Sequence, residues 1–121
     1  MTKEESYQKV AEACHMANKV FCNLIGDNSQ PDWENAPQWQ KTSALEGVKR
    51  VALNPNLGDD ALHNSWMQDK LDRGWKWGKE KDAELKTHPC IVAFSALPSE
   101  QQAKDKLFML IAREGLKFYG V

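Results

Sequence analysis

The spacing of apolar side chains predicts a long first helix over residues 4–25. Thr2 and Glu5 form the pattern of a capping box, in which each side chain satisfies a free amide at the start of a helix. Gly26 suits the left-handed backbone that often ends a helix. Intervals of three and four predict one buried face, made of Val10, Cys14, Ala17, Phe21 and Leu24.

A second helix is expected over residues 37–52, after a loop rich in glycine, asparagine and proline that holds Trp33. Asn54 precedes Pro55, and a residue before proline avoids helical backbone angles, so the helix ends there. Its inward side chains are expected to be Trp39, Leu45, Val48 and Val51.

The C-terminal half predicts two further helices around a short β element. Residues 59–74 form the third helix, and the apolar run over residues 90–94 has the composition of a strand. Pro98 suits the first turn of a fourth helix, and residues 116–121 are expected to be extended. The apolar face of this helix is expected to be Ala103, Leu107, Phe108, Ile111 and Ala112. The fold class is therefore mainly α with a short β element, an α+β arrangement of about four helices in a single domain.

Composition limits the partners. The chain has 121 residues, 41% hydrophobic residues, a net charge of −1 and a pI near 6.3. This balance argues against duplex nucleic acid and membrane surfaces, which select an excess of lysine and arginine. No signal core or membrane-length apolar run is present, and the three cysteines have no disulfide or zinc spacing. We expect a cytoplasmic protein with reduced thiols, no cofactor and no metal.

The sequence contains none of the common catalytic signatures, neither a nucleophile elbow nor a glycine-rich phosphate loop nor a zinc-protease motif. His88 and Cys90 would share one face of a strand, but an apolar flank raises the pKa of a thiol and weakens it as a nucleophile. We therefore expect no catalytic residue and no enzyme activity.

Two groups of residues are candidates for ligand binding. On an ideal helix His63, Trp66 and Lys70 fall within a sector of roughly 60°, so an indole can stack a planar base beside an imidazole and an ammonium group. The alternative is an ordinary amphipathic helix. The second group is a basic run interleaved with tryptophans, which is typical of nucleotide surfaces but also of a solvated turn: Arg73, Trp75, Lys76, Trp77, Lys79 and Lys81.

Several motifs follow one another in a fixed order. They are H-x-x-W at His63 and Trp66, RGWKWG over residues 73–78, Lys81 before Asp82, and HPCIVAF over residues 88–94. This series resembles the RyR domain, the repeat of ryanodine receptors, over residues 57–112, most closely over residues 62–98. Trp77 stands where the family often has tyrosine, which keeps the ring and loses the hydroxyl. Residues 1–56 would be an N-terminal helical extension and residues 113–121 a tail.

The resemblance implies a site for an adenine-type nucleotide. In the calcium-release channels the repeats occur in pairs, and the base stacks on the H-x-x-W tryptophan of each repeat. Carried over, Trp66 stacks the base, His63 or Asn64 reads it, and Lys70 and Lys81 contact phosphate. Trp75, Trp77 and His88 complete the candidate ligand-binding set. A single repeat would rebuild the clamp by pairing with a second copy, so we expect a homodimer.

The chain is also similar to small RyR-domain proteins of bacteria and their phages, which implies sensing or sequestering of a nucleotide messenger in the bacterial or host cytoplasm. Two alternatives stay open. One is a protein-interaction or structural module with Trp33, Trp75 and Trp77 as anchors. The other is a small nucleotide-processing enzyme with His88 as its base. A purely structural His88, with its ring bonded to a backbone carbonyl, is the plain alternative to any role in binding.

Overall fold

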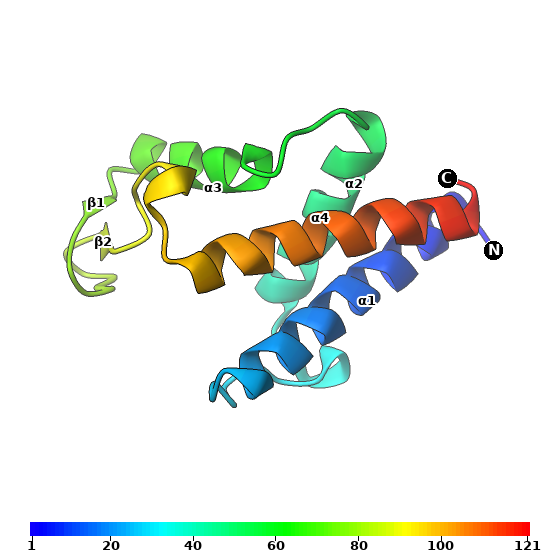
Figure 1. The fold of residues 1–121 in the computed structure, drawn as a ribbon, viewed down its shortest axis with the longest axis horizontal. Coiled ribbons are helices and arrows are strands. Elements are labelled where there is room, and N and C mark those ends of the chain that lie inside the picture. The colour runs from blue at the N-terminus through cyan, green and yellow to red at the C-terminus, as the bar shows by residue number, and fades with distance from the viewer. The chain divides into compact units, whose positions relative to one another are not determined.

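The computed structural model describes residues 1–121 and is mainly helical, with one short two-stranded sheet (Figure 1). This confirms the predicted fold class. The α-helices are α1 (Lys3–Leu24), α2 (Gln38–Leu53), α3 (Ala61–Asp72) and α4 (Ser99–Tyr119). The strands are β1 (Lys76–Trp77) and β2 (Thr87–His88), and short 3-10 helices cover Trp33–Asn35 and Phe94–Ala96.

The chain forms two compact units, each of which we describe by itself. The helical unit comprises Met1–Leu57 and Lys106–Val121, and the pocket unit comprises Gly58–Asp105. Helix α4 thus begins in the pocket unit and continues in the helical unit. The division expected from the sequence, at residues 57 and 112, stays a prediction.

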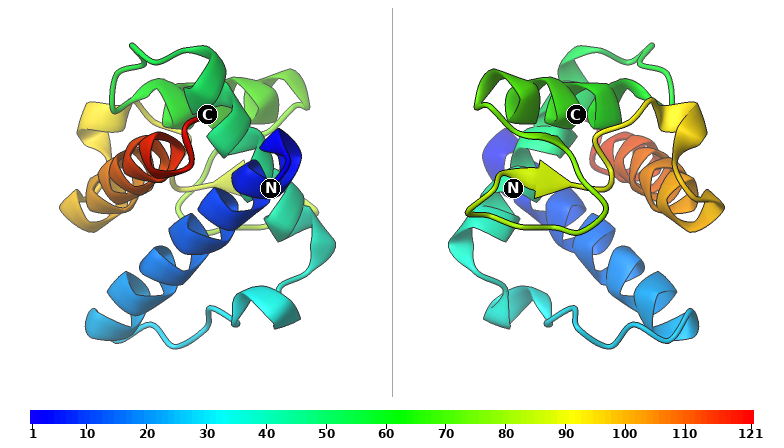
Figure 2. Two further views of the ribbon diagram at one scale, coloured as in Figure 1. Left: turned by 90° about the vertical axis from the view of Figure 1, so that its right-hand side faces the viewer. Right: turned by 90° about the vertical axis from the view of Figure 1, so that its left-hand side faces the viewer.

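The helical unit buries its core where α1, α2 and the second part of α4 pack together. Val10, Val48 and Met109 are at most 1% exposed. A Cβ atom added at Gly115 would lie 3.0 Å from Val10, so the absence of a side chain there allows α1 and α4 to approach closely. Both chain termini lie at the same end of this unit (Figure 2).

The first helix begins as predicted. The Glu5 amide donates to the Thr2 hydroxyl at 3.1 Å, and the Thr2 amide donates to the Glu5 carboxylate, which completes the capping box. Gly26 has a φ of 90°, in the left-handed region. One predicted core residue is wrong: Leu24 is 80% exposed. It has the correct helical phase but occupies the last residue of α1, where no other element covers it.

The prediction for Trp39 is also wrong, because its side chain is 72% exposed. Helix α2 turns Val48 and Val51 into the core. Trp39 precedes Val48 by nine residues, which places it about 180° around an ideal helix. Trp39 therefore points to solvent for the same reason that Val48 is buried.

The C-terminal tail is helical, which corrects the expected extended segment. Helix α4 runs to Tyr119 and buries Met109, Ala112 and Leu116 at helical spacing. Of the face predicted for this helix, only Ala112 is fully buried. Gly120, with a φ of 71°, ends the helix, and the Val121 amide donates to the Leu116 carbonyl at 3.0 Å. This is a Schellman arrangement, which a glycine just beyond a helix favours.

The predicted strand over residues 90–94 is wrong. Residues 89–90 form a turn, and the segment then enters the 3-10 helix Phe94–Ala96. Its backbone groups serve other partners: the Ile91 amide donates to the His88 carbonyl, and the Val92 carbonyl accepts from His63. The sheet lies just before it, where β1 and β2 pair in parallel with Lys76 opposite Thr87 and Trp77 opposite His88.

The turn that joins the two strands is tightly built. A Cβ atom added at Gly78 would lie 2.4 Å from the Thr87 Cβ, so only glycine fits where the strands meet. Within the turn, Asp82 accepts backbone hydrogen bonds from Glu84 and Leu85, at 2.9 and 3.1 Å. The Asp82 and Thr87 backbones also exchange two hydrogen bonds of 3.0 Å. These contacts fix the start of the segment that carries Lys81.

None of the helices combines the length and the apolar character needed to cross a bilayer.

Candidate functional site

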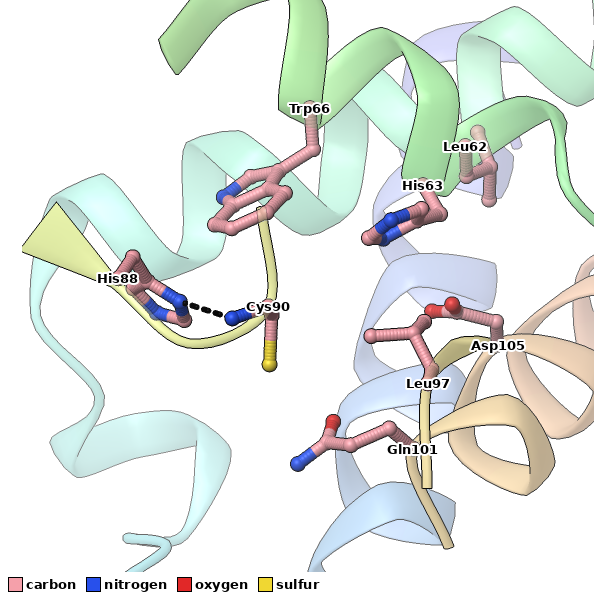
Figure 3. Close-up of a pocket in the computed structure, with 8 residues that line it drawn as sticks. All are labelled: Leu62, His63, Trp66, His88, Cys90, Leu97, Gln101 and Asp105. Atoms are coloured by element: carbon pink, nitrogen blue, oxygen red, sulfur yellow. Dashed lines mark hydrogen bonds between the residues drawn. The ribbon is translucent and has the colours of Figure 1, made fainter. Parts of the chain in front are cut away.

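The pocket unit contains a cavity of about 280 Å³ (Figure 3). Ligand pockets usually range over about 300–1,000 Å³, so this one suits a single ring system rather than a whole dinucleotide. Its walls come from α3, from the end of β2 and the turn after it, and from the residues around the start of α4. The lining residues are Leu62, His63, Trp66, His88, Cys90, Leu97, Gln101 and Asp105.

The indole of Trp66 extends from α3 toward the space bordered by Cys90 and Leu97 (Figure 3). It is half-buried, and two imidazoles flank it. The ring of His88 meets it edge-on with centroids 5.0 Å apart, and the ring of His63 lies 5.7 Å away. The sequence predicts Trp66 beside His63, and the structure adds His88 on the other flank.

His63 is buried, with 6% of its surface exposed. Its Nε2 lies 2.8 Å from the Val92 carbonyl oxygen, so this nitrogen carries a proton and donates. In the neutral ring Nδ1 is therefore the free acceptor. The bond to a backbone carbonyl, which the structural alternative assigned to His88, belongs to His63. His63 ties α3 to the segment after β2 and also forms part of the pocket wall.

A hydrogen bond, burial and nearby positive charges all favour the neutral form of His88. The Cys90 amide donates to its Nδ1 at 3.0 Å, so that nitrogen is unprotonated and Nε2 carries the proton. Burial lowers the pKa of His88 below its usual range, and the positive charges of Lys81 and Lys70 lower it further. The charges of Lys70 and Lys81, the two residues predicted to contact phosphate, therefore both act on His88.

Lys70 has a second partner. Its ammonium group lies 4.4 Å from the ring centroid of Trp75, a cation–π arrangement. Trp75 is half-buried but does not line the cavity. Trp75 therefore contacts Lys70 but not the cavity itself.

Two predicted residues lie away from the cavity. Asn64 is exposed on α3, where its amide donates to the Asp60 carboxylate at 3.3 Å. Trp77 is 57% exposed on β1, and only its backbone is paired with that of His88. The structure thus gathers His63, Trp66 and His88 in one wall. The other predicted residues, Asn64, Lys70, Trp75, Trp77 and Lys81, do not line the cavity, although the charges of Lys70 and Lys81 act on His88.

The start of α4 contributes a wall of the cavity that the sequence did not predict. Leu97, Gln101 and Asp105 recur every four residues, which places them on one face of the helix and its lead-in. Apolar spacing alone does not reveal such a face, because it mixes an apolar side chain with two polar ones. Burial raises the pKa of Asp105, while the charges of His63 and Lys104 partly oppose that effect.

Cys90 lines the pocket with a protonated thiol. Burial raises its pKa, and the carboxylate of Asp105 raises it further. A protonated thiol is a weak nucleophile. No group of three or more histidine, cysteine or carboxylate side chains is arranged to hold a metal ion. The site therefore offers an aromatic wall, two nearby ammonium groups and polar side chains, which are means of binding.

A family model described as the RyR domain matches residues 51–119. The match extends beyond residues 57–112, the range expected from the motifs, at both ends. It includes α3, both strands and α4, and so every residue that lines the cavity. The match covers 69 of the 121 residues, which is more than half of the chain. This protein therefore belongs to the RyR domain family.

Proposed function

We propose that this protein is a non-catalytic nucleotide-binding module whose pocket takes the base of an adenine-type nucleotide or nucleotide messenger. One observation carries the proposal: Trp66 forms a wall of the cavity, and the charges of Lys70 and Lys81 both act on His88 at its flank. An aromatic wall and two cations beside one small cavity match the two ends of a nucleotide, a planar base and an anionic phosphate.

The base would stack on Trp66. Stacking of a base on an aromatic side chain contributes about 1–3 kcal/mol. Leu62 and Leu97 add apolar surface to the same cavity. The edge-on contact with His88 and the tilted contact with His63 hold the indole in place without ligand, so a bound base does not have to order it.

The phosphate would lie on the His88 side. Lys70 and Lys81 supply ammonium groups, which form charge-assisted hydrogen bonds to phosphate oxygens. The protonated Nε2 of neutral His88 is a further donor, because Nδ1 is occupied by the Cys90 amide. The negative charge of the phosphate would also reduce the electrostatic repulsion between Lys70 and Lys81.

We further propose that a second copy of the chain completes the site. The cavity volume of about 280 Å³ lies just below the usual range for pockets that enclose a ligand. The unstacked face of a base on Trp66 would then meet the Trp66 of the partner, and a symmetric dimer is the simplest closed assembly. Light scattering with and without nucleotide measures this directly.

The same site suits the role suggested by small RyR-domain proteins of bacteria and their phages, which is to sense or sequester a nucleotide messenger in the cytoplasm. No catalytic group is assigned. The thiol of Cys90 is held protonated, and Nδ1 of His88 already accepts a hydrogen bond. Binding without turnover is the expectation, and product analysis after incubation with each nucleotide checks it.

The test is a panel of ATP, ADP-ribose and cyclic mono-, di- and trinucleotides. Binding of each nucleotide is measured by the change in melting temperature and in tryptophan fluorescence. A ligand that binds only the folded state stabilises it by about 2.7 kcal/mol at one hundred times its dissociation constant. Trp66→Ala should abolish the shift. Trp39→Ala is the matched control, because Trp39 is 72% exposed and lies in the other unit. No shift across the panel, or an equal shift in Trp66→Ala, refutes the proposal.

A second candidate function, a protein-interaction module, is favoured by one observation. Of the three anchors expected for it, Trp77 is 57% exposed, whereas Trp33 and Trp75 are half-buried. Trp39, which was expected in the core, is 72% exposed, although tryptophan usually buries most of its surface. Exposed aromatic side chains are frequent anchors of interfaces. A partner whose binding is lost in Trp77→Ala and kept in Trp66→Ala would support this function over nucleotide binding.

A further inference from the structure

Two polar side chains of α4 border the pocket without a hydrogen-bond or salt-bridge partner in the protein. Gln101 and Asp105 lie one helical turn apart, and their side chains reach the cavity, Asp105 on the His63 side and Gln101 below Cys90 (Figure 3). Neither side chain makes a hydrogen bond or a salt bridge within the protein. Half-buried polar groups of this kind cost free energy unless water or a ligand satisfies them.

The surroundings of Asp105 leave room for a donor from a ligand. His63 faces it from α3, but Nε2 of that ring donates to the Val92 carbonyl and not to the carboxylate. Lys104, its neighbour on α4, affects it only through charge. An ionised carboxylate accepts hydrogen bonds and cannot donate them. The group that suits this position is therefore an N–H donor on the edge of whatever ring occupies the cavity.

Bases differ in what they present at such a position. Adenine and cytosine carry an exocyclic amino group, which donates, whereas hypoxanthine and uracil carry an oxygen at the same place, which accepts. Carboxylates pair with base amino groups in nucleic-acid recognition. An oxygen directed at Asp105 would bring two acceptors together and leave both unsatisfied.

We infer that Asp105 is the specificity-determining residue of this pocket, accepting a hydrogen bond from the exocyclic amino group of the bound base and so selecting amino bases over their oxo counterparts. This inference rests on the proposed function and deepens it. Gln101, one turn earlier, has both a donor and an acceptor and can adapt to either kind of base, so discrimination falls to the carboxylate.

The other role open to Asp105 is purely electrostatic, as a negative charge beside His63. That role predicts no preference between two ligands of equal charge. ATP and ITP form such a pair, because they differ only at position 6 of the purine and the adjacent ring nitrogen, as an amino base and an oxo base. The same comparison between CTP and UTP repeats the test on a smaller ring.

The experiment measures dissociation constants of ATP and ITP by calorimetry for the wild type, Asp105→Asn and Glu100→Gln. The wild type should prefer ATP by at least about fivefold, the lower end of a specific base contact. Asp105→Asn supplies an N–H donor with nearly the same shape, so it should abolish or reverse the preference. Glu100→Gln removes the same charge from an exposed position on the same helix and should keep it.

The outcomes separate the two proposals. Equal binding of ATP and ITP by the wild type, or an unchanged preference in Asp105→Asn, overturns the role of Asp105 and leaves nucleotide binding intact. No binding of either nucleotide overturns both. An amide spectrum of Asp105→Asn that matches the wild type, recorded first, establishes that a lost preference does not reflect a lost fold.

Discussion

The Cys90 amide donates a hydrogen bond of 3.0 Å to Nδ1 of His88, and this contact holds the ring in its neutral form at the edge of the pocket. Burial lowers the pKa of His88 below the ordinary value of 6.5, with further contributions from Lys81 and Lys70. Because the folded pKa lies below the unfolded one, the stabilisation is full above pH 6.5 and is lost as the pH falls through the folded pKa.

The first prediction concerns this titration. Histidine resonances followed by NMR from pH 8 downward should show His88 protonating below the usual range. Lys81→Ala should raise that pKa without restoring it fully, since burial is the larger cause. Lys79→Ala, an exposed lysine in the same turn, is the control and should change nothing. An unchanged titration in Lys81→Ala would mean that Lys81 is not near the pocket.

The second prediction concerns His63, whose ring is buried and bonded to the Val92 carbonyl at 2.8 Å. His63→Ala leaves that carbonyl without its partner, which should lower the free energy of unfolding by about 1–3 kcal/mol. Asn64→Ala, next along the helix and exposed, should change it by less than about 0.5 kcal/mol. Urea denaturation measures both. Equal stability of the two variants would contradict the anchoring role of His63.

The third prediction concerns thiol reactivity. Burial raises the pKa of Cys14 to about 12, and Cys14 and Cys22 are only 2% and 1% exposed. Cys90 is partly exposed in the pocket wall, so a single slow equivalent should react with a disulfide reagent before unfolding. A bound nucleotide should protect it, and Cys90→Ser should remove that equivalent. Rapid modification of all three thiols in the native protein would refute the buried placement.

The fourth prediction concerns Asp105 and stability. Burial raises its pKa above the ordinary 3.8, so the folded state holds the proton more tightly than the unfolded state does. The resulting stabilisation is present at acid pH and is lost as the pH rises through the folded pKa. His63 and Lys104, the charged groups that face this carboxyl, limit the loss.

Asp105→Asn should therefore be more stable than the wild type at neutral pH, with a difference that shrinks toward pH 3.8. Thermal melts of both proteins across that range measure the difference. A less stable Asp105→Asn at neutral pH would show that the carboxylate has a favourable partner in the protein. In that case it would not be free for a ligand.

Much of the helical framework could be predicted from the sequence, because it depends on local signals. The Thr2–Glu5 capping box and Gly26 fixed the limits of α1 to within one residue. The assignment of Trp39 failed because its size suggested burial, whereas the phase set by Val48 places it on the opposite side of α2. Hydrophobicity alone does not determine the buried side of a helix.

The β element and the pocket could be predicted only in part. The run over residues 90–94 has strand composition, but its backbone bonds to the His63 ring and to turns, which no local pattern reveals. The proximity of Trp66 and His63 could be predicted because the two residues share a helix. Asp105 and Gln101 reach the same cavity from a helix some forty residues later in the chain, and that proximity depends on tertiary structure.

The close approach of Gly78 to Thr87 has a consequence for how the protein can vary. It clamps both ends of the turn over residues 79–86, so the turn is a closed loop whose ends stay fixed whatever lies between them. The entropy of closing such a loop rises only slowly with its length. Insertions or deletions there would shift the cation at Lys81 while leaving the aromatic wall unchanged. A change in the length of this loop would therefore alter the charge that acts on His88 independently of the aromatic wall at Trp66.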